Sequence, residues 1–188
     1  MTTWKIDTAH TDVSFSAKHM MVTTVRGKFA EVDGSITLDE NDPTRSHGEF
    51  TVAAASLATG VERRDQHLRS ADFFDVGNYP TIAFSSTGIV STGKDTYAVT
   101  GDLTIRDTTR PITFDVEVLG YYTSMTGGRK VGLSATAKLA RDEWNLGWNV
   151  ALETGGWLVG KTVALEIDVS ADEVLAPVEA PVLTPVAA

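Results

Sequence analysis

Four histidines are the residues of this chain best suited to bind a metal or to act as a general base: His10, His19, His47 and His67. His10 and His19 lie nine positions apart in one alternating stretch. Such a stretch spans roughly 30 Å when extended, so the two cannot share a metal ion without a sharp bend. No His-x-His pair occurs either. We therefore expect structural hydrogen bonds from these histidines, with no metal site and no catalytic residue.

Residues 61–77 read VERRDQHLRSADFFDVG and hold a dense set of charges. Asp65, Asp72 and Asp75 together with His67 could form an acid/base pair. Capping and ion pairs with the neighbouring arginines account for the same residues without any chemistry, and we favour this interpretation. An arginine cluster near the end of a barrel would also match a phosphate or pyrophosphate head group through charge-assisted hydrogen bonds. The candidate head-group residues are Arg63, Arg64, His67 and Arg69.

Trp144, Trp148 and Trp157 lie within a 14-residue stretch. A tryptophan often plugs the end of a barrel and donates a hydrogen bond through its indole N–H. Aromatic side chains could equally form the lip through which a lipid enters, and both interpretations stay open. The strand serines, such as Ser85 and Ser86, lack the strand–turn–helix motif of a hydrolase nucleophile, so we expect no hydrolase.

The composition is that of an ordinary globular domain with an acidic balance. The 188 residues are 42% hydrophobic and 22% charged, with a net charge of −9 and no cysteine. The negative field disfavours nucleic acid and anionic membrane surfaces as partners. No run approaches the ~18 apolar residues of a transmembrane helix, and the first residues carry no secretion signal. We expect a cytoplasmic protein without stable membrane insertion.

Period-two alternation of apolar and polar residues dominates the chain, as in Val13, Phe15 and Ala17. It predicts eight strands of roughly 8 to 12 residues joined mostly by short turns, and closing such an antiparallel sheet removes its edges. Phe29 is out of phase with Val32, which predicts a bulge near Glu31. Residues 61–77 do not alternate and predict one or two short helices across a barrel end. We therefore expect a barrel domain over residues 1–170 and, over residues 171–188, an extended tail containing three prolines.

An ordered set of motifs narrows the fold further. The chain carries WKIDTAHT at residues 4–11, ASLATG at 55–60, RDQHLRSADFFD at 64–75, GDLT at 101–104 and RDEWNLG at 141–147. Phe15, His19, Gly27, Phe29, Tyr79-Pro80 and Pro111 accompany them. Over about residues 4–170 the chain resembles the YceI-like family of polyisoprenoid-binding, lipocalin-like proteins. The block at 64–75 is the most specific of these motifs.

The resemblance implies a mostly β fold, an extended eight-stranded antiparallel lipocalin-like barrel with short helices at about 61–77 at one end. It also implies a bacterial binding or carrier protein, not an enzyme, with an isoprenoid lipid such as a polyprenyl phosphate or a quinone tail in the lumen. The alternatives are an enzyme acting on a lipid or quinone in the barrel, and a structural or regulatory barrel with a packed lumen. No cofactor other than a bound lipid is expected. A homodimer is possible.

The lumen of an eight-stranded barrel is either filled by side chains or just wide enough for one small ligand. Alternation does not separate these cases. A mixture of small and large inward residues leaves room, and the resemblance favours a cavity. The expected ligand-binding residues are Phe15, Phe29, Val52, Leu68, Phe73, Phe74, Phe84, Phe114, Leu133, Ala135, Trp144 and Leu165.

Overall fold

The computed structural model describes residues 1–123, 128–153 and 155–175. These contain one α-helix, α1 (Glu62–Arg69), and four short 3-10 turns, η1 (Thr8–His10), η2 (Pro43–Arg45), η3 (Ala54–Ser56) and η4 (Arg141–Trp144). The strands of the described part are β1 (Thr2–Ile6), β2 (Asp12–His19), β3 (Thr23–Phe29), β4 (Val32–Leu38), β5 (His47–Ala53), β6 (Leu57–Ala58), β7 (Thr81–Gly93), β8 (Thr96–Ile105), β9 (Thr108–Thr123), β10 (Arg129–Ala140) and β11 (Val159–Glu173).

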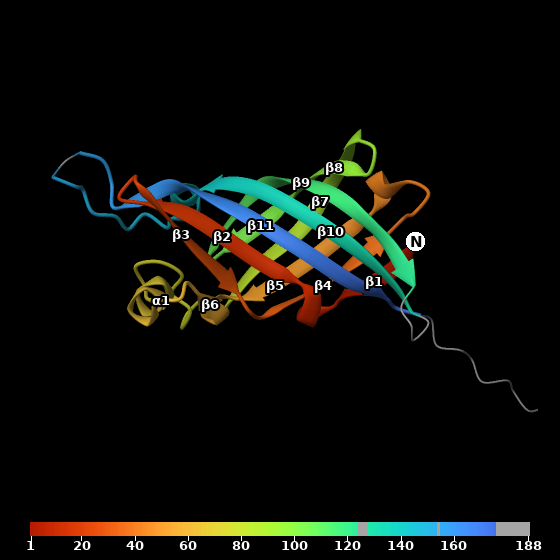
Figure 1. Cartoon of the computed structure of the whole chain (residues 1–188), viewed down its shortest axis with the longest axis horizontal. Coiled ribbons are helices and arrows are strands. Elements are labelled where there is room, and N and C mark those ends of the chain that lie inside the picture. Colours follow the sequence, from red (N-terminus) through yellow and green to blue (C-terminus); the bar gives the residue numbers. More distant parts are fainter. Residues whose placement is uncertain (124–127, 154, 176–188) are drawn as a thin grey trace, which may run out of the picture.

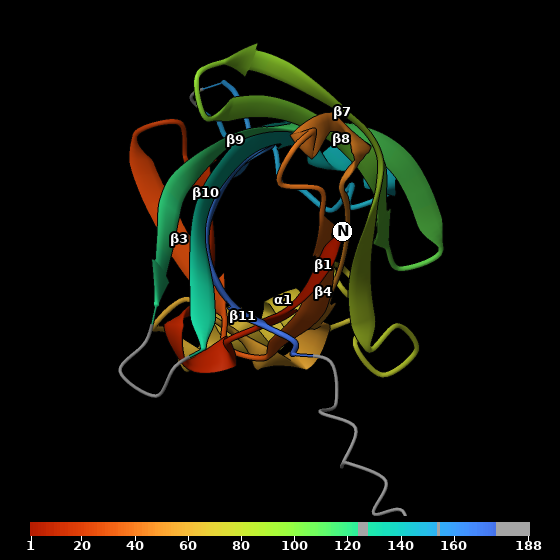
Figure 2. The same cartoon turned by 90° about the vertical axis from the view of Figure 1, so that its right-hand side faces the viewer.

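The strands form one antiparallel sheet in the order β1-β4-β5-β7-β8-β9-β10-β11-β2-β3-β6, and pairing of β1 with β11 closes it. Three long strands are each interrupted once, so that β1 continues as β2, β3 as β4 and β5 as β6. The same long strands remain neighbours on both sides of the interruptions, because β1 pairs with β4 and its continuation β2 pairs with β3. With β7 to β11 the described residues therefore form a closed eight-stranded barrel (Figures 1 and 2), as the sequence predicts.

In place of the bulge predicted near Glu31, the structure has a break of two residues, Ala30 and Glu31, between β3 and β4. Strand β3 ends at Phe29, β4 begins at Val32, and both of these side chains are buried. The odd spacing of three between two inward residues is thus accommodated by interrupting the strand. The freed carbonyl of Glu31 accepts a hydrogen bond from the Ala53 N–H at 3.0 Å, so the break costs no backbone partner there.

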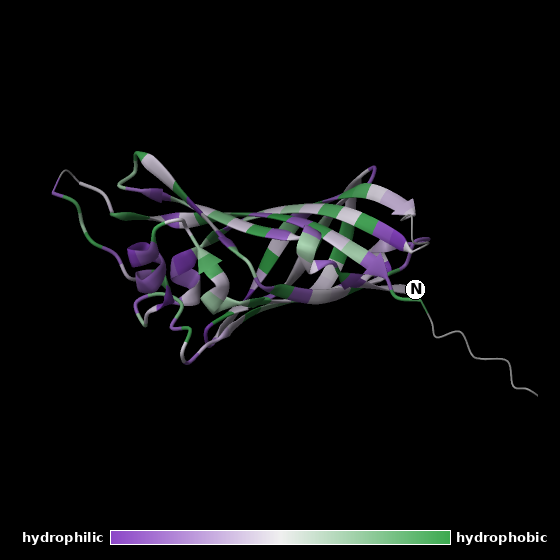
Figure 3. Ribbon diagram, turned by 60° about the horizontal axis from the view of Figure 1, so that its bottom comes forward, coloured by the Kyte–Doolittle hydropathy of each residue, from purple (hydrophilic) through white to green (hydrophobic). Residues whose placement is uncertain are grey.

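Hydrophobic and hydrophilic residues alternate in bands along the strands (Figure 3), because one face of each strand points into the barrel. Helix α1 and the turns that follow it lie at one end of the barrel, and the N-terminus lies at the other (Figure 1). At the N-terminal end Trp4, Val131 and Ala171 have no exposed surface and pack with Ile6, Ile36 and Val169. This cluster fills that end of the barrel.

Strand β11 continues three residues beyond the expected domain boundary, to Glu173. The part of the predicted tail from residue 176 onward lies outside the described residues. Within the described residues, no helix has the length and apolarity needed to cross a membrane.

Candidate functional site

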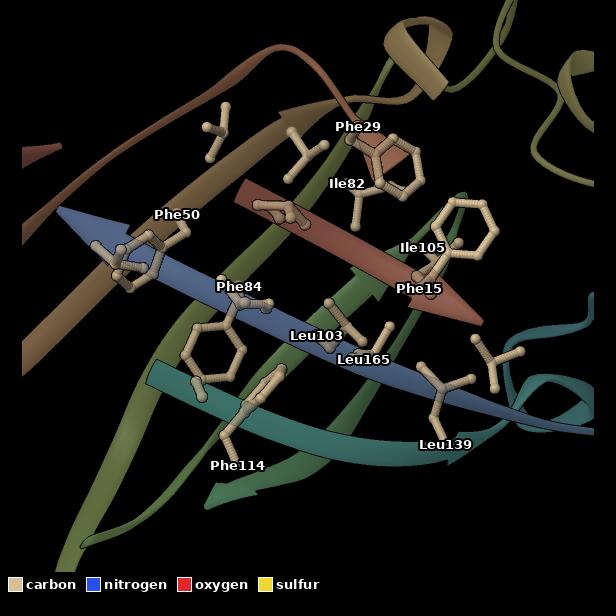
Figure 4. A pocket seen from close by; sticks show the side chains of 18 of the residues that line it. Phe15, Phe29, Phe50, Ile82, Phe84, Leu103, Ile105, Phe114, Leu139 and Leu165 are labelled. Atoms are coloured by element: carbon tan, nitrogen blue, oxygen red, sulfur yellow. The ribbon is translucent and has the colours of Figure 1, made fainter. Parts of the chain in front are cut away.

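The barrel contains a cavity of about 290 Å³, many times the ~10–15 Å³ that one water molecule needs. Inward side chains of nearly every strand line it, and almost all of them are apolar. Figure 4 shows several of these side chains directed into the same space from different strands. The cavity reaches the α1 end, because residues of α1, of the turns after it and of the loop after η4 also line it.

Eleven of the twelve predicted ligand-binding residues line this cavity: Phe15, Phe29, Val52, Leu68, Phe73, Phe74, Phe84, Phe114, Leu133, Ala135 and Leu165. Trp144 does not. It is 1% exposed, and η4 turns its indole onto β8, where Nε1 donates to the Leu103 carbonyl at 2.9 Å. Trp144 therefore acts as a plug. The sequence analysis missed further wall residues in the same inward phase, among them Phe50, Ile82, Leu103, Ile105 and Leu139.

Phenylalanines of the wall lie over glycines of the neighbouring strands. A Cβ atom placed on Gly27 would lie 2.5 Å from Cζ of Phe15, and one placed on Gly34 would lie 2.8 Å from Cδ1 of Phe50. Each ring thus occupies the space that a side chain on the neighbouring strand would otherwise fill, a packing known to support glycines in sheets. The rings of Phe15 and Phe50 therefore lie against the wall.

Three polar side chains lie in the wall, and the protein itself satisfies them. Thr11 Oγ1 donates to the Ser170 carbonyl at 3.3 Å and accepts from the Ser170 N–H at 3.2 Å. Ser86 Oγ accepts from the Gly48 N–H at 2.9 Å. Arg141, the third, is bound to backbone carbonyls. A molecule in the lumen would therefore be held mainly by apolar contact, since a polar group inside it would find few free partners.

Arg141 fastens the loop that follows η4 to the barrel. Its side chain is 3% exposed, Nε donates to the Gly160 carbonyl at 3.0 Å, and Nη1 donates to the carbonyls of Trp148, at 3.0 Å, and Leu146. Burial lowers the pKa of Arg141 below its ordinary value. No carboxylate of the described residues lies within ion-pair distance of Arg141, so backbone carbonyl oxygens stabilise its charge.

Two of the predicted head-group arginines hold α1 in place. Arg64 Nε donates to Thr59 Oγ1 at 2.7 Å and its Nη2 to the Thr59 carbonyl at 2.9 Å. Arg69 donates to the carbonyls of Ala55, at 3.0 Å, and Leu57, at 2.6 Å. These bonds tie the helix to η3 and β6. Asp65, one member of the possible acid/base pair, is buried and accepts from the Thr59 N–H at 2.9 Å, which is also a structural role.

His67 joins α1 to the loop after η4. Its ring meets the rings of Phe73 and Trp148 edge-on, with centroids 5.2 and 4.5 Å away, and Nε2 lies 2.9 Å from Asp72 Oδ2. These contacts cover the end of the barrel. Arg63, the fourth predicted head-group residue, is exposed on α1.

The other histidines make polar contacts in separate places. His10 Nδ1 lies 2.8 Å from Asp7 Oδ2 beside η1. His47 Nδ1 lies 3.0 Å from Ser86 Oγ, while its Nε2 lies 3.3 Å from Glu49 Oε1. Among the described residues, no group of three or more histidines and carboxylates is arranged to hold a metal ion.

The Ser86–His47–Glu49 contacts place a serine, a histidine and a carboxylate in a row, an arrangement that the sequence analysis missed because Ser86 is 39 residues from His47. The Gly48 N–H, however, is directed at the Ser86 hydroxyl itself and not at the place of an oxyanion. His47 and Glu49 both point to solvent. The geometry is that of a structural hydrogen-bond network between β5 and β7.

Comparison with known proteins gives a consistent result. A UPF0312 protein of Staphylococcus aureus (strain USA300) is 38% identical over 167 residues, which cover 88% of this chain and 95% of that protein. The structure of Burkholderia cenocepacia BcnA is similar with a TM-score of 0.77 at 23% identity, covering 88% of this chain and 98% of that one. A polyisoprenoid binding domain from Saccharophagus degradans has the same fold, with a TM-score of 0.67 at 10% identity over 93% of this chain and all of that domain. A family model described as a YceI-like domain matches residues 4–171, and the chain belongs to this family.

Proposed function

We propose that this protein binds an isoprenoid lipid in the barrel lumen and carries it. The observation that carries this proposal is the cavity of about 290 Å³, whose wall is formed almost entirely by apolar side chains. Burial of an apolar chain there contributes ~25 cal/mol for each Å² removed from water, before the costs of ordering. The similarity in fold to the Saccharophagus degradans polyisoprenoid binding domain supports the same ligand class.

The polar end of the lipid would be directed to the α1 end. The opposite end is filled by Trp4, Val131 and Ala171, and the polar atoms of the wall are bonded to the protein. Of the predicted head-group residues, Arg63 is exposed and His67 half-exposed at the α1 end, while Arg64 and Arg69 are held by carbonyls. We therefore assign contacts to a phosphate or quinone head group to Arg63 and His67 first.

Native mass spectrometry of the purified protein tests the proposal. The expected result is an added mass that, after organic extraction, is identified as an isoprenoid lipid. The stripped protein should then bind geranylgeranyl phosphate at a stoichiometry of one. Protein that carries no lipid, and that binds neither this probe nor geranylgeraniol, would contradict a carrier role and favour a barrel with another task.

A further inference from the structure

Two loops form an apolar surface at the α1 end of the barrel. The β2–β3 turn lies against the loop between η4 and β11, where the Met20 N–H donates to the Leu158 carbonyl at 2.8 Å. Both loops project at this end (Figure 1). Their large apolar side chains are between 46% and 78% exposed, and we call them the barrel tip: Met20, Met21, Val22, Val150 and Trp157. Gathered apolar exposure of this kind marks an interaction surface.

The backbone of the tip has a conformation that its residues do not favour. Met20 has a φ of 50° and Met21 a φ of 62°, in the left-handed region where glycine and asparagine are preferred. A methionine there costs conformational energy and exposes its apolar side chain as well. Met21 Cγ lies 3.5 Å from the position of a Cβ atom on Gly156 in the other loop, so part of this side chain packs within the tip. About half of each methionine remains exposed and is available to a partner.

The β2–β3 hairpin, which carries Met20, Met21 and Val22, is basic in an acidic protein, whereas the other loop of the tip carries Glu153. Residues 13–30 contain Lys18, Arg26 and Lys28 and no carboxylate, although the whole chain has a net charge of −9. Val13, Phe15 and Ala17 line the cavity, so the basic residues point outward, and register places them on one outer face of the β2–β3 hairpin. In the described part of the chain none of the three is in an ion pair with a carboxylate.

The cavity extends to the base of the tip. Its wall includes Ala17 and Val159, and Val159 pairs with His19, the last residue before Met20. The far end of the barrel differs from the tip in its cavity and in its charge. It is filled by the Trp4 cluster, and Glu40 and Glu173 there are both paired with Arg129, so the protein itself neutralises these charges.

We propose that the barrel tip docks on an anionic lipid bilayer, from which the lumen takes up its isoprenoid. Tryptophan and other large apolar side chains partition into the membrane interface, and nearby Lys and Arg add attraction to anionic head groups. The uptake step rests on the function proposed above, whereas the docking step does not. Salt screens electrostatic interactions beyond about 10 Å. The attraction to an anionic bilayer is therefore decided by the local charge of the hairpin and not by the net charge of the chain.

Cosedimentation with phosphatidylcholine vesicles that contain phosphatidylglycerol tests the docking. The double substitution M20N/M21N removes apolar surface while asparagine keeps the left-handed backbone, so folding should be preserved. We expect at least about a tenfold loss of vesicle binding, since one methionine side chain contributes ~1.5 kcal/mol or more on burial. The matched control is Val90→Asn, which changes an apolar side chain, 64% exposed, on β7 far from the tip and should bind as the wild type does.

Charge substitutions give a second readout. Lys18→Gln and Arg26→Gln should each weaken binding about fivefold, because a basic residue near an anionic surface is worth ~1 kcal/mol. Lys94→Gln removes the same charge from the β7–β8 turn and should leave binding unchanged. Equal binding of wild type and M20N/M21N, or equal binding to vesicles with and without phosphatidylglycerol, would overturn the proposal. So would a dimer that forms at rising protein concentration and is lost in M20N/M21N, if the protein binds no vesicles.

Binding of geranylgeranyl phosphate without vesicles separates this proposal from the proposed function. M20N/M21N should bind the free lipid as tightly as the wild type but take it up more slowly from vesicles. Normal uptake by this variant would overturn the role of the tip and leave the lumen site intact. Vesicle binding by a protein that binds no isoprenoid would overturn the lumen site and leave the docking surface standing.

Discussion

Replacing Ala135 with tryptophan should block the lumen. Ala135 lies in the middle of β10, lines the cavity, and pairs with Val116 and Ile167, which line it too. The cavity of about 290 Å³ is nearly twice the ~150 Å³ of a protein cavity that holds benzene. An indole is larger than benzene, so the new side chain would fill more than half of the lumen.

The effect on binding is large and the effect on stability is small. A buried tryptophan covers ~150 Å² or more of surface that the lipid would otherwise cover. At ~25 cal/mol per Å² this amounts to about 4 kcal/mol, so we expect affinity for geranylgeranyl phosphate to fall at least a hundredfold. The indole N–H would find no acceptor in the apolar lumen, which costs ~1–3 kcal/mol of stability. Burial of the indole ring offsets this cost. Ala135→Phe avoids that cost and should block nearly as well.

Titration of intrinsic fluorescence and thermal unfolding, measured on the same samples, check this prediction. Ala164→Trp is the matched control, because Ala164 pairs with Ser16 and Lys138 on the outer face of the barrel. It should bind lipid normally. Unchanged affinity in Ala135→Trp with an unchanged melting temperature would refute the lumen as the binding site. A melting temperature lowered by many degrees would instead place Ala135 in a packed layer.

Three further predictions concern the barrel itself. Gly101→Ala should lower the free energy of unfolding by ~1–3 kcal/mol, measured by urea denaturation, because the new Cβ would collide with the Phe84 ring and with the Ser85 carbonyl. A cost near zero would show that the ring and the backbone of β7 both yield freely. The ammonium of Lys130, 2.7 Å from Asp7, lowers the pKa of that carboxyl from 3.8 to about 2. Lys130→Gln should therefore lower the free energy of unfolding by about 1 kcal/mol, after screening, at pH values above 3.8. The difference from the wild type should shrink as the pH falls through 2. A difference that does not depend on pH would contradict the ion pair. Trp144→Phe should cost ~1–3 kcal/mol by removing a buried hydrogen bond, with lipid affinity unchanged, since this side chain does not line the cavity.

The strands were predictable because each has one face in the barrel and one in water. Such a strand must alternate, and a break in alternation such as Phe29 to Val32 marks an irregularity, which the structure has as an interruption between β3 and β4. Closure was not visible in the same way. It depends on Trp4 pairing with Glu173, almost the full length of the chain away, and nothing local to either residue specifies that partner.

The roles of the charged residues at the α1 end were harder to predict. Arg64 and Arg69 were expected to pair with carboxylates or with a head group, yet both donate to backbone carbonyls, as Arg141 also does. Arg69 lies within ion-pair distance of Glu62 as well, at 3.7 Å. Carbonyl groups are present at every position, so the sequence holds no sign of which ones turn toward a guanidinium. Arg63, which the sequence analysis does not distinguish from Arg64 and Arg69, is the one of these three that is exposed.

Whether the barrel is hollow depends on pairs of residues and not on single strands. Gly27, Gly34 and Gly101 all occupy inward positions, and each leaves space for a phenylalanine of the adjacent strand. The inward residues of each strand, taken one strand at a time, do not decide whether these phenylalanines fill the lumen or line it. Once the register is known, the same rings lie over glycines and belong to the wall, so the lumen stays open. An inward glycine directly opposite an inward phenylalanine, as in the Phe15–Gly27 pair, is thus a sequence signal for a cavity wherever the register of a hairpin can be fixed.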